Sequence, residues 1–273
     1  MTKSKDANSR MKGSTTSGQM NKKRTLQLSE DKLRSDGRRT DQLRPIKMTP
    51  NCADYAEGSV LVEFGQTRVM CTASFEAKPP SWLIGSGRGW VTAEYGMLPR
   101  STHQRIKRDK ASTSGRTQEI SRLIGRSLRA GIDLSLLGER QIIVDCDVLN
   151  ADGGTRTASV TGGFVALALA CQKLLEVGEI KKNPLTHYVS AVSVGLVDNH
   201  FLLDLNFDED SAISTDMNFV MTHQGHFVEV QGTAEEQAFT KDELFAMMGL
   251  AETGCQVLFQ EQQKQIGDFF PIP

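Results

Sequence analysis

Apolar residues are distributed unevenly along the chain, and this distribution separates two regions. The first 34 residues are rich in Ser, Thr, Lys, Asn and Gly and have almost no apolar periodicity. Such a segment cannot bury enough surface to offset the entropy lost on ordering. From about residue 35 onward, apolar residues recur at the spacings of strands and helices. We therefore predict a disordered basic tail over residues 1–34 and a folded domain over residues 35–273.

Within the folded region the apolar pattern predicts strands and helices in alternation. Strands are predicted at 59–64 and 67–74, which form a hairpin with a turn at Gly65-Gln66, and at 90–95, 141–149, 189–197, 201–207 and 217–232. Helices are predicted over 117–137, ended by Gly138, over 158–177, and from about Lys241. Strands in pairs with helices between them indicate an α+β fold of mixed or antiparallel sheets, with two similar halves.

Composition narrows the class of protein. The 273 residues are 38% hydrophobic and 24% charged, which is typical of a globular protein. We predict no membrane association, because no run approaches the roughly 18 apolar residues of a membrane span and no signal peptide is evident. The five cysteines are scattered and contain no CxxC pair, so neither a disulfide framework nor a zinc site is indicated. Together these features favour the cytoplasm.

Charge is segregated although the net charge is only -1. Residues 1–34 hold nine basic and three acidic residues, whereas residues 88–129 hold ten basic and three acidic residues. A basic stretch inside an otherwise acidic body is a plausible footprint for a polyanion such as nucleic acid. The alternative is a run of charges that only keeps the surface solvated.

Two segments are candidates for binding a phosphate group. Gly153-Gly154-Thr155-Arg156 joins a predicted strand to a predicted helix, and a helix N-terminus offers free N–H groups and a favourable dipole to an anion. The alternative is a glycine turn with a capping threonine. Arg116 begins the preceding helix and is suited to gripping a phosphate. The basic residues that follow Arg116 on one helix face are Arg122, Arg126 and Arg129. They either bind an anion or form a solvated face with local partners such as Glu119.

Two carboxylates are candidates for binding a metal ion beside the predicted phosphate site. Asp210 and Asp216 lie where one predicted strand ends and the next begins, and they could converge to hold Mg²⁺, which takes oxygen ligands and often bridges carboxylates to a substrate phosphate. Because turns are commonly acidic, a solvated turn remains the alternative.

Five long stretches, in order, resemble the bacterial ribonuclease PH family. They are AEGSVLVEFG at 56–65, GWVTAEYGMLPRSTH at 89–103, DCDVLNADGGTRTAS at 145–159, EDSA at 209–212 with TDMN at 215–218, and EVQGTAE at 229–235. The resemblance runs from about Arg34 to the C-terminal helix. Five matches in family order are far more specific than any single motif.

The resemblance implies a fold, an activity and an assembly. The fold would be that of ribosomal protein S5 domain 2, and the activity would be phosphorolytic removal of 3′-terminal nucleotides from tRNA precursors, with ribosomal RNA as a further substrate. Inorganic phosphate would be the co-substrate and Mg²⁺ the metal. The assembly would be a homohexamer, built as a trimer of dimers. The alternatives that remain are a catalytically silent RNA-binding ring subunit and a metal-dependent hydrolytic nuclease.

The resemblance also assigns roles to individual residues. It places Arg116, Gly154, Thr155 and Arg156 at the phosphate site, and Asp210 and Asp216 at the catalytic and metal site, where Arg116 would assist. The residues expected to contact RNA are Arg100, Arg105 and Arg108, in a loop associated with tRNA, and Arg122 and Arg126 on the following helix. The long basic tail departs from the compact pattern of the family.

Overall fold

The computed structural model describes residues 34–108, 114–197, 200–213, 215–234 and 238–271. The prediction of a disordered tail therefore lies outside the described residues, except at Arg34, which is buried in the folded domain. The elements in chain order are β1 (Ile46–Pro50), β2 (Gly58–Phe64), β3 (Thr67–Glu76), η1 (Ser81–Leu83), β4 (Trp90–Met97), α2 (Gly115–Arg129), β5 (Gln141–Asn150), α3 (Thr155–Glu176), β6 (Val189–Val197), β7 (His200–Leu203), α4 (Phe207–Ala212), β8 (Thr215–Thr222), β9 (Phe227–Ala234), α5 (Lys241–Ile266) and η2 (Gly267–Phe269).

Two sheets form the framework, and the predicted α+β fold is confirmed. The first sheet has the order β1-β2-β3-β5-β4, in which only β4 and β5 are parallel. The second sheet is antiparallel throughout, with the order β7-β6-β8-β9. Buried and partly exposed residues alternate along β3 and β5, so one face of the first sheet is packed and the other remains accessible.

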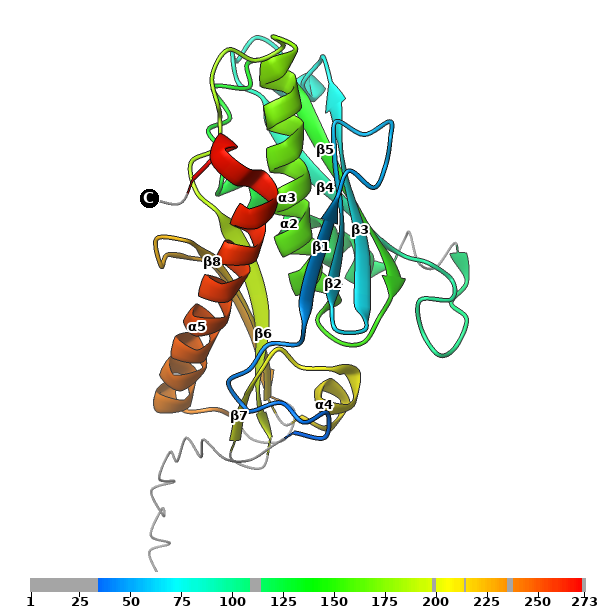
Figure 1. Cartoon of the computed structure of the whole chain (residues 1–273), viewed down its shortest axis with the longest axis vertical. Coiled ribbons are helices and arrows are strands. Elements are labelled where there is room, and N and C mark those ends of the chain that lie inside the picture. The colour runs from blue at the N-terminus through cyan, green and yellow to red at the C-terminus, as the bar shows by residue number, and fades with distance from the viewer. Residues whose placement is uncertain (1–33, 109–113, 198–199, 214, 235–237, 272–273) are drawn as a thin grey trace, which may run out of the picture.

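Helix α3 lies between the two sheets (Figure 1), and its side chains belong to the core that both sheets share. It packs against β2 and β3 on one side and β6 on the other. Although α3 is long and apolar enough to cross a membrane, 78% of its most apolar stretch is buried inside the protein, which is the position of a core helix. Helix α2 covers β4, and α5 packs against β6, β7 and β1. The two sheets are therefore joined through one buried helix.

Helix α2 is shorter than the pattern predicts. The side chain of Ser114 accepts a hydrogen bond from the Thr117 N–H at 3.1 Å and begins the helix, but the helix ends at Arg129 rather than near Gly138. At Gly131 the backbone leaves the helix, since its carbonyl oxygen accepts a hydrogen bond from the Thr186 N–H at 2.9 Å, and a side chain there would meet the His187 carbonyl oxygen at 2.7 Å. The chain can pass this point closely only as glycine. Ile132 then forms an isolated bridge with Leu185 instead of extending the helix.

The strand predicted over 201–207 is also shorter in the structure. β7 ends at Leu203, and Asp204 adopts a left-handed conformation with φ of 55°. Asn206 then caps α4 in a reciprocal pair with Glu209, whose backbone N–H donates to Asn206 at 3.0 Å. The acidic segment, predicted as the connection between two strands, is therefore partly a short helix, which fixes the direction of its side chains.

Candidate active site

A cleft of about 930 Å³ opens beside α3 and is lined by residues of both sheets. The first sheet and its connections contribute β4, the segment that follows it, the start of α2 and the start of α3. The second sheet contributes β6, α4 and β8. The cleft contains most of the residues predicted from the sequence, namely Arg105, Arg116, Gly154, Thr155, Arg156, Asp210 and Asp216.

The N-terminus of α3 forms one wall of this cleft. Gly153 and Gly154 have φ of 73° and 62°, and a side chain at Gly153 would meet the Leu205 carbonyl oxygen at 2.5 Å. Gly154 is the N-cap of this 22-residue helix, and no side-chain cap among the described residues closes its first turn. The N–H groups and dipole of a long helix therefore face the cleft, as an anion site requires.

Two arginines flank this helix terminus in different ways. Arg116, in the first turn of α2, is exposed and has no hydrogen bond or ion pair with another residue that the structure describes. Arg156 donates from Nη1 to Oε1 of Gln231 at 2.9 Å and lies 3.7 Å from Oε1 of Glu119. Arg156 is therefore already held in place by α2 and β9, while the charge of Arg116 is free for an anion.

Tyr95, which the sequence analysis did not single out, links the strand to the anion site. Its hydroxyl lies 2.9 Å from Oγ1 of Thr155, and its ring is 5% exposed. Burial raises the pKa of Tyr95, although the hydrogen bond with Thr155 and the charges of Arg116 and Arg156 act in the opposite direction. The hydroxyl consequently stays protonated and orients Thr155 at the first position of α3.

The two candidate carboxylates lie on the opposite side of the cleft. Asp210 is on α4, and Asp216 is on β8, where Oγ1 of Thr233 donates a hydrogen bond to it. Burial and the charge of Asp216 raise the pKa of Asp210, while Arg116, Arg156 and Arg44 partly oppose this rise. The structure thus brings the predicted acidic and basic groups within electrostatic reach of one another.

The carboxylates of the cleft fit a Mg²⁺ site only if the substrate supplies further ligands. Among the described residues, no group of three or more His, Cys, Asp or Glu side chains could hold a metal ion. Asp210 and Asp216 provide two carboxylates, and Mg²⁺ is often bound by one or two carboxylates together with substrate phosphate and water. The residues therefore fit a substrate-assisted magnesium site and not a closed protein cage.

The predicted RNA-contacting arginines do not all meet at the cleft. Arg105 lines it, but Arg108 lines a separate groove of about 400 Å³ whose acidic side chains are Glu94, Asp145 and Asp147. Arg100 donates to the His103 carbonyl oxygen at 3.1 Å and does not line the cleft.

The arginines of α2 also differ from one another. Arg122 is exposed and has no partner among the described residues. Arg126 is paired with Glu229 through two hydrogen bonds of 2.7 and 3.1 Å, and Arg129 lies over the Trp90 ring at 4.3 Å. The predicted unpaired basic face is therefore incomplete, since two of its three members have partners within the chain.

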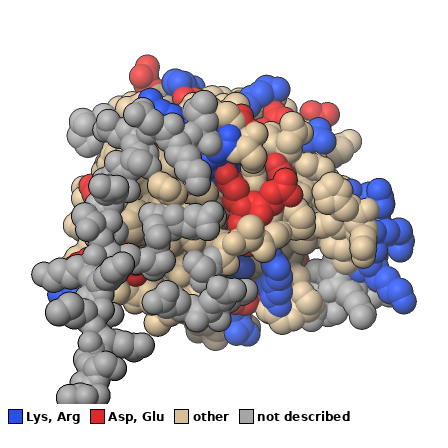
Figure 2. Space-filling model, turned by 90° about the horizontal axis from the view of Figure 1, so that it is seen from below, with Lys and Arg blue, Asp and Glu red and all other residues tan. Residues whose placement is uncertain are grey.

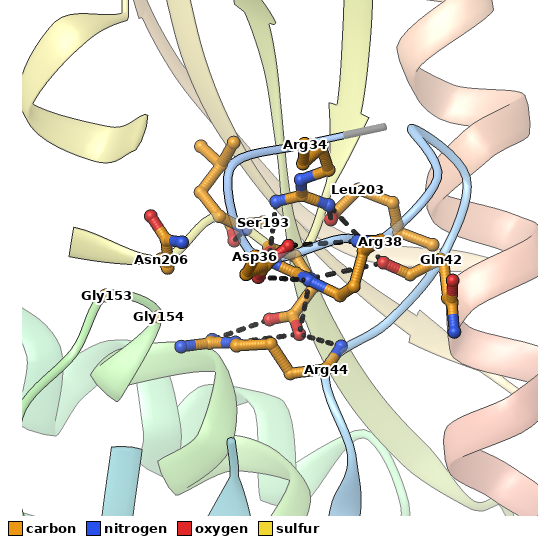
Figure 3. A network of polar contacts seen from close by, with 12 residues as sticks. Arg34, Asp36, Arg38, Gln42, Arg44, Gly153, Gly154, Ser193, Leu203 and Asn206 are labelled. Atoms are coloured by element: carbon orange, nitrogen blue, oxygen red, sulfur yellow. Dashed lines mark hydrogen bonds and ion pairs between the residues drawn. The ribbon is translucent and has the colours of Figure 1, made fainter. Parts of the chain in front are cut away.

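A second set of arginines, also missed by the sequence analysis, lies behind the cleft and is buried (Figure 3). The Arg44 side chain forms two hydrogen bonds with the carboxylate of Asp204, at 2.7 and 2.9 Å, and its backbone N–H forms a third at 2.8 Å. The side chain also donates to the Asp152 carbonyl oxygen. Burial acts to lower the pKa of Arg44, but the charge and hydrogen bonds of Asp204 outweigh it and raise the pKa. Arg44 thus ties the β7 terminus to the loop that precedes Gly153.

The rest of this set connects the N-terminal segment to α4. Arg34 binds both carboxylate oxygens of Glu209 and donates to the Asp204 carbonyl oxygen at 3.1 Å. Arg38 donates to the same carbonyl oxygen at 2.9 Å. We call Arg34, Arg38, Arg44, Asp204 and Glu209 the arginine clamp. Because Glu209 precedes Asp210, the arginine clamp positions the carboxylate wall as well as the glycine loop.

The end of the molecule that carries β7 and α4 shows how these charges reach the surface (Figure 2). Acidic side chains gather near the centre of this face, and basic side chains lie around them. The first turn of α4 contributes Asp208, Glu209 and Asp210 to this end of the protein. On this face, acidic and basic side chains of the described residues therefore lie beside one another.

Comparisons with known proteins identify the family to which the sequence is similar. Residues 42–172 match the sequence model of the 3′ exoribonuclease family, domain 1, and residues 187–254 match that of domain 2. The chain is 69% identical over 240 residues to ribonuclease PH of Bdellovibrio bacteriovorus, a match covering 88% of this chain and 99% of the relative. It is 52% identical over 242 residues to ribonuclease PH of Bacillus subtilis, with the same coverage.

Solved structures with low sequence identity share the fold. Rice Rrp46 superposes with a TM-score of 0.70 at 18% identity, covering 85% of this chain and 100% of the other. An Archaeoglobus fulgidus exosome with RNA bound to its active site gives a TM-score of 0.70 at 22% identity, covering 85% and 93% of the two chains. The α+β arrangement of this chain is therefore one that these solved structures also adopt.

Proposed function

The chain belongs to the 3′ exoribonuclease family and is a phosphorolytic 3′-to-5′ exoribonuclease, and we propose that tRNA precursors are its main substrates and the cleft beside α3 is its active site. Ribosomal RNA is a further proposed substrate. The observation that supports the site most strongly is the meeting of Arg116, the α3 N-terminus, Asp210 and Asp216 in one cleft.

The proposed reaction exchanges the phosphoester bond to the 3′ oxygen for a phosphoanhydride bond in the released nucleoside diphosphate. An oxygen of inorganic phosphate attacks the phosphorus of the last 3′,5′ linkage, the bond from that phosphorus to the 3′ oxygen breaks, and a nucleoside diphosphate leaves. The released 3′ oxygen takes up a proton and becomes the new RNA terminus. Because the phosphoanhydride bond that forms offsets the phosphoester bond that breaks, the reaction is reversible and the same site can add nucleotides from diphosphates.

Positive charge must gather around two anions for this reaction to proceed. We assign the incoming phosphate to Arg116, Arg156 and the N–H groups at Gly154 and Thr155. Arg156 is held by Gln231 at 2.9 Å, so its position is set before substrate arrives. Arg116 has no internal partner among the described residues and is free to turn towards the phosphate. Such preorganised charge aligns the nucleophile with its target.

The carboxylates would serve the leaving oxygen and the metal. Asp210, which lines the cleft together with the basic groups, would assist the proton transfer to the leaving oxygen. Asp216 would act beside it. Asp210 and Asp216 would also hold Mg²⁺, which when bound offsets negative charge on the transferring phosphoryl group.

We also propose that the enzyme acts in the cytoplasm as a homohexamer, a trimer of dimers. Exposed apolar side chains such as Trp82 and Ile84, which are 64–66% exposed in the single chain, support burial against other copies. Sedimentation of the purified protein tests the assembly. A single species with the mass of one chain at micromolar concentration would contradict it.

The activity is tested with a tRNA precursor labelled in its 3′-terminal nucleotide, incubated with and without phosphate. Phosphate-dependent release of labelled nucleoside diphosphate is the expected result. Release of a monophosphate without phosphate would identify a hydrolytic nuclease, and binding without release would identify a silent subunit.

The assignment of the carboxylates is tested by Asp210→Asn and Asp216→Asn at saturating Mg²⁺. Each variant should lose turnover without unfolding, because both residues line the cleft and neither belongs to the hydrophobic core. Asp208→Asn is the matched control, since Asp208 is an exposed carboxylate on the same short helix that does not line the cleft. Near-normal rates in both cleft variants would remove the proposed role.

A further inference from the structure

One wall of the cleft is aromatic and has no role in the chemistry assigned above. His103 follows β4, and Phe207 is the first residue of α4, 104 positions later in the chain. Their ring centroids lie 6.0 Å apart, with 57° between the ring planes. Both residues line the cleft, and Phe207 is 47% exposed there.

The two rings are held by contacts that fix their backbones. The Phe207 N–H donates to Oδ1 of Asp152 at 3.3 Å, and α4 is anchored through Glu209 to Arg34. The His103 carbonyl oxygen accepts a hydrogen bond from Arg100 at 3.1 Å. Little conformational freedom of these backbones would be lost when a ligand covers the rings, so the surface is preorganised for binding.

The position of Phe207 near Asp210 indicates which part of the RNA would bind to the two rings. Asp210 is three residues further along the same helix, so the two side chains are neighbours on its surface. An RNA strand whose scissile phosphate lies between Arg116 and Asp210 would place its neighbouring bases beside Phe207. Because the two rings contact each other, the pair offers its exposed side to a base and does not form a slot.

We propose that His103 and Phe207 form a stacking subsite for a nucleobase of one of the two nucleotides joined by the scissile linkage. This inference rests on the proposed location of the active site. Stacking suits an exonuclease that must accept every base in turn, because each base has a π-face and stacking does not read its hydrogen-bonding edge.

The test compares Phe207→Ala and Phe207→Tyr with the wild-type enzyme on short RNA oligonucleotides. Stacking on one aromatic residue has an effect of about 5- to 150-fold on binding, so Phe207→Ala should lose kcat/KM for RNA by that factor. The KM for phosphate should stay unchanged, and Phe207→Tyr should retain most of the activity. Phe245→Ala is the control, because Phe245 is 54% exposed on α5 and does not line the cleft.

Oligonucleotides lacking a base at the terminal or the penultimate position identify the stacked nucleotide. The wild-type enzyme should lose activity with one of them, and Phe207→Ala should lose nothing further with that same substrate, because the two changes remove one interaction. The proposal would be overturned if, for both substrates, the loss caused by the missing base and the loss caused by Phe207→Ala multiplied. Phe207→Ala activity within twofold of the wild type, or an equal loss in Phe245→Ala, would also overturn it.

Equilibrium binding separates this proposal from the assignment of the reaction. Fluorescently labelled oligoadenylate is titrated in phosphate-free buffer, where no phosphorolysis occurs. Weaker binding by Phe207→Ala but not by Phe245→Ala supports the subsite even if the wild-type enzyme releases no diphosphate. Unchanged binding by Phe207→Ala, beside normal diphosphate release by the wild type, overturns the subsite and leaves the proposed reaction intact.

Discussion

The protein uses arginine in two regions for two different purposes. In the arginine clamp, Arg34, Arg38 and Arg44 are 4–8% exposed and bind carboxylates or backbone carbonyl oxygens. In the cleft, Arg105 and Arg116 are exposed and have no hydrogen bond or ion pair with any residue the structure describes. The difference lies in the partners and not in the residue type. The buried, paired arginines hold segments of the fold together, and the exposed, unpaired ones that face the cleft are available to a ligand. Arg156, which lines the cleft while it is paired with Gln231, lies between these two cases.

The two regions are connected through two short segments of backbone. Arg44 holds the Asp152 carbonyl oxygen, next to the glycine loop, and Arg34 holds Glu209, next to Asp210. The arginine clamp therefore fixes both walls of the cleft from behind, while no residue of the clamp lines the cleft itself. This arrangement separates the groups that create the geometry from the groups that would use it.

The largest effect is expected when the arginine clamp loses its central carboxylate. Asp204→Asn leaves Arg44 buried without its counter-charge, and breaking a buried ion pair from one side costs about 3–5 kcal/mol. Urea unfolding should show this loss of stability. The control is Asp41→Asn, whose pair with Arg39 is at least half exposed on both sides and should contribute about 0–1 kcal/mol. Equal effects of the two changes would contradict the comparison.

Arg116→Ala is expected to have a smaller effect, which changes the activation free energy of the reaction and not the stability of the fold. Loss of one preorganised donor to reacting oxygens lowers rates by about 10²–10³-fold, so kcat/KM for phosphate should fall by that factor. The melting temperature should stay the same, because Arg116 has no internal partner to lose among the described residues. Arg122→Ala, an exposed arginine of the same helix outside the cleft, is the matched control. A lowered melting temperature would show that Arg116 is structural.

Arg105 and Arg108 allow a finer test, because the structure separates two residues that the sequence analysis grouped. Only Arg105 lines the cleft, whereas Arg108 faces a groove with three carboxylates. Arg105→Ala should flatten the slope of log affinity for tRNA against log salt concentration by roughly 0.7–0.9, the contribution of one phosphate contact. Arg108→Ala should change it less. Equal salt slopes for the two variants would show that Arg105 and Arg108 contact RNA alike, as the sequence predicted. Sedimentation of both variants is the control, and it must show an unchanged assembly.

The sequence predicted elements with strong local patterns and missed contacts that depend on distant residues. The Ala-rich run of α3 and the glycines before it were evident from short stretches of chain. Gly131 gave no local sign that it, and not Gly138, would end α2, because its constraint is a close approach to His187. Arg34 was assigned to the tail, since its neighbours lack periodicity, but its partners Asp204 and Glu209 are at least 170 residues away in sequence. The pairing of His103 with Phe207 was hidden for the same reason.

The smallest effect is expected where carboxylates lie together without an arginine hydrogen-bonded to them. Burial raises the pKa of Asp145, and the charges of Glu94 and Asp147 raise it further. A raised pKa in the folded state means that the ionised carboxyl costs stability at neutral pH. This cost begins to fall as the pH drops through the folded pKa and is gone below the pKa of the unfolded chain. Asp145→Asn should therefore melt slightly higher than the wild type at pH 7. Its advantage should shrink as the pH falls towards 3.8, the ordinary pKa of aspartate. Melting curves of both proteins across this pH range, at equal assembly state, measure the difference. A variant that melts lower than the wild type at pH 7 would show that the Asp145 carboxylate has a favourable partner. The distinction between charged groups with and without partners would then not apply to this groove.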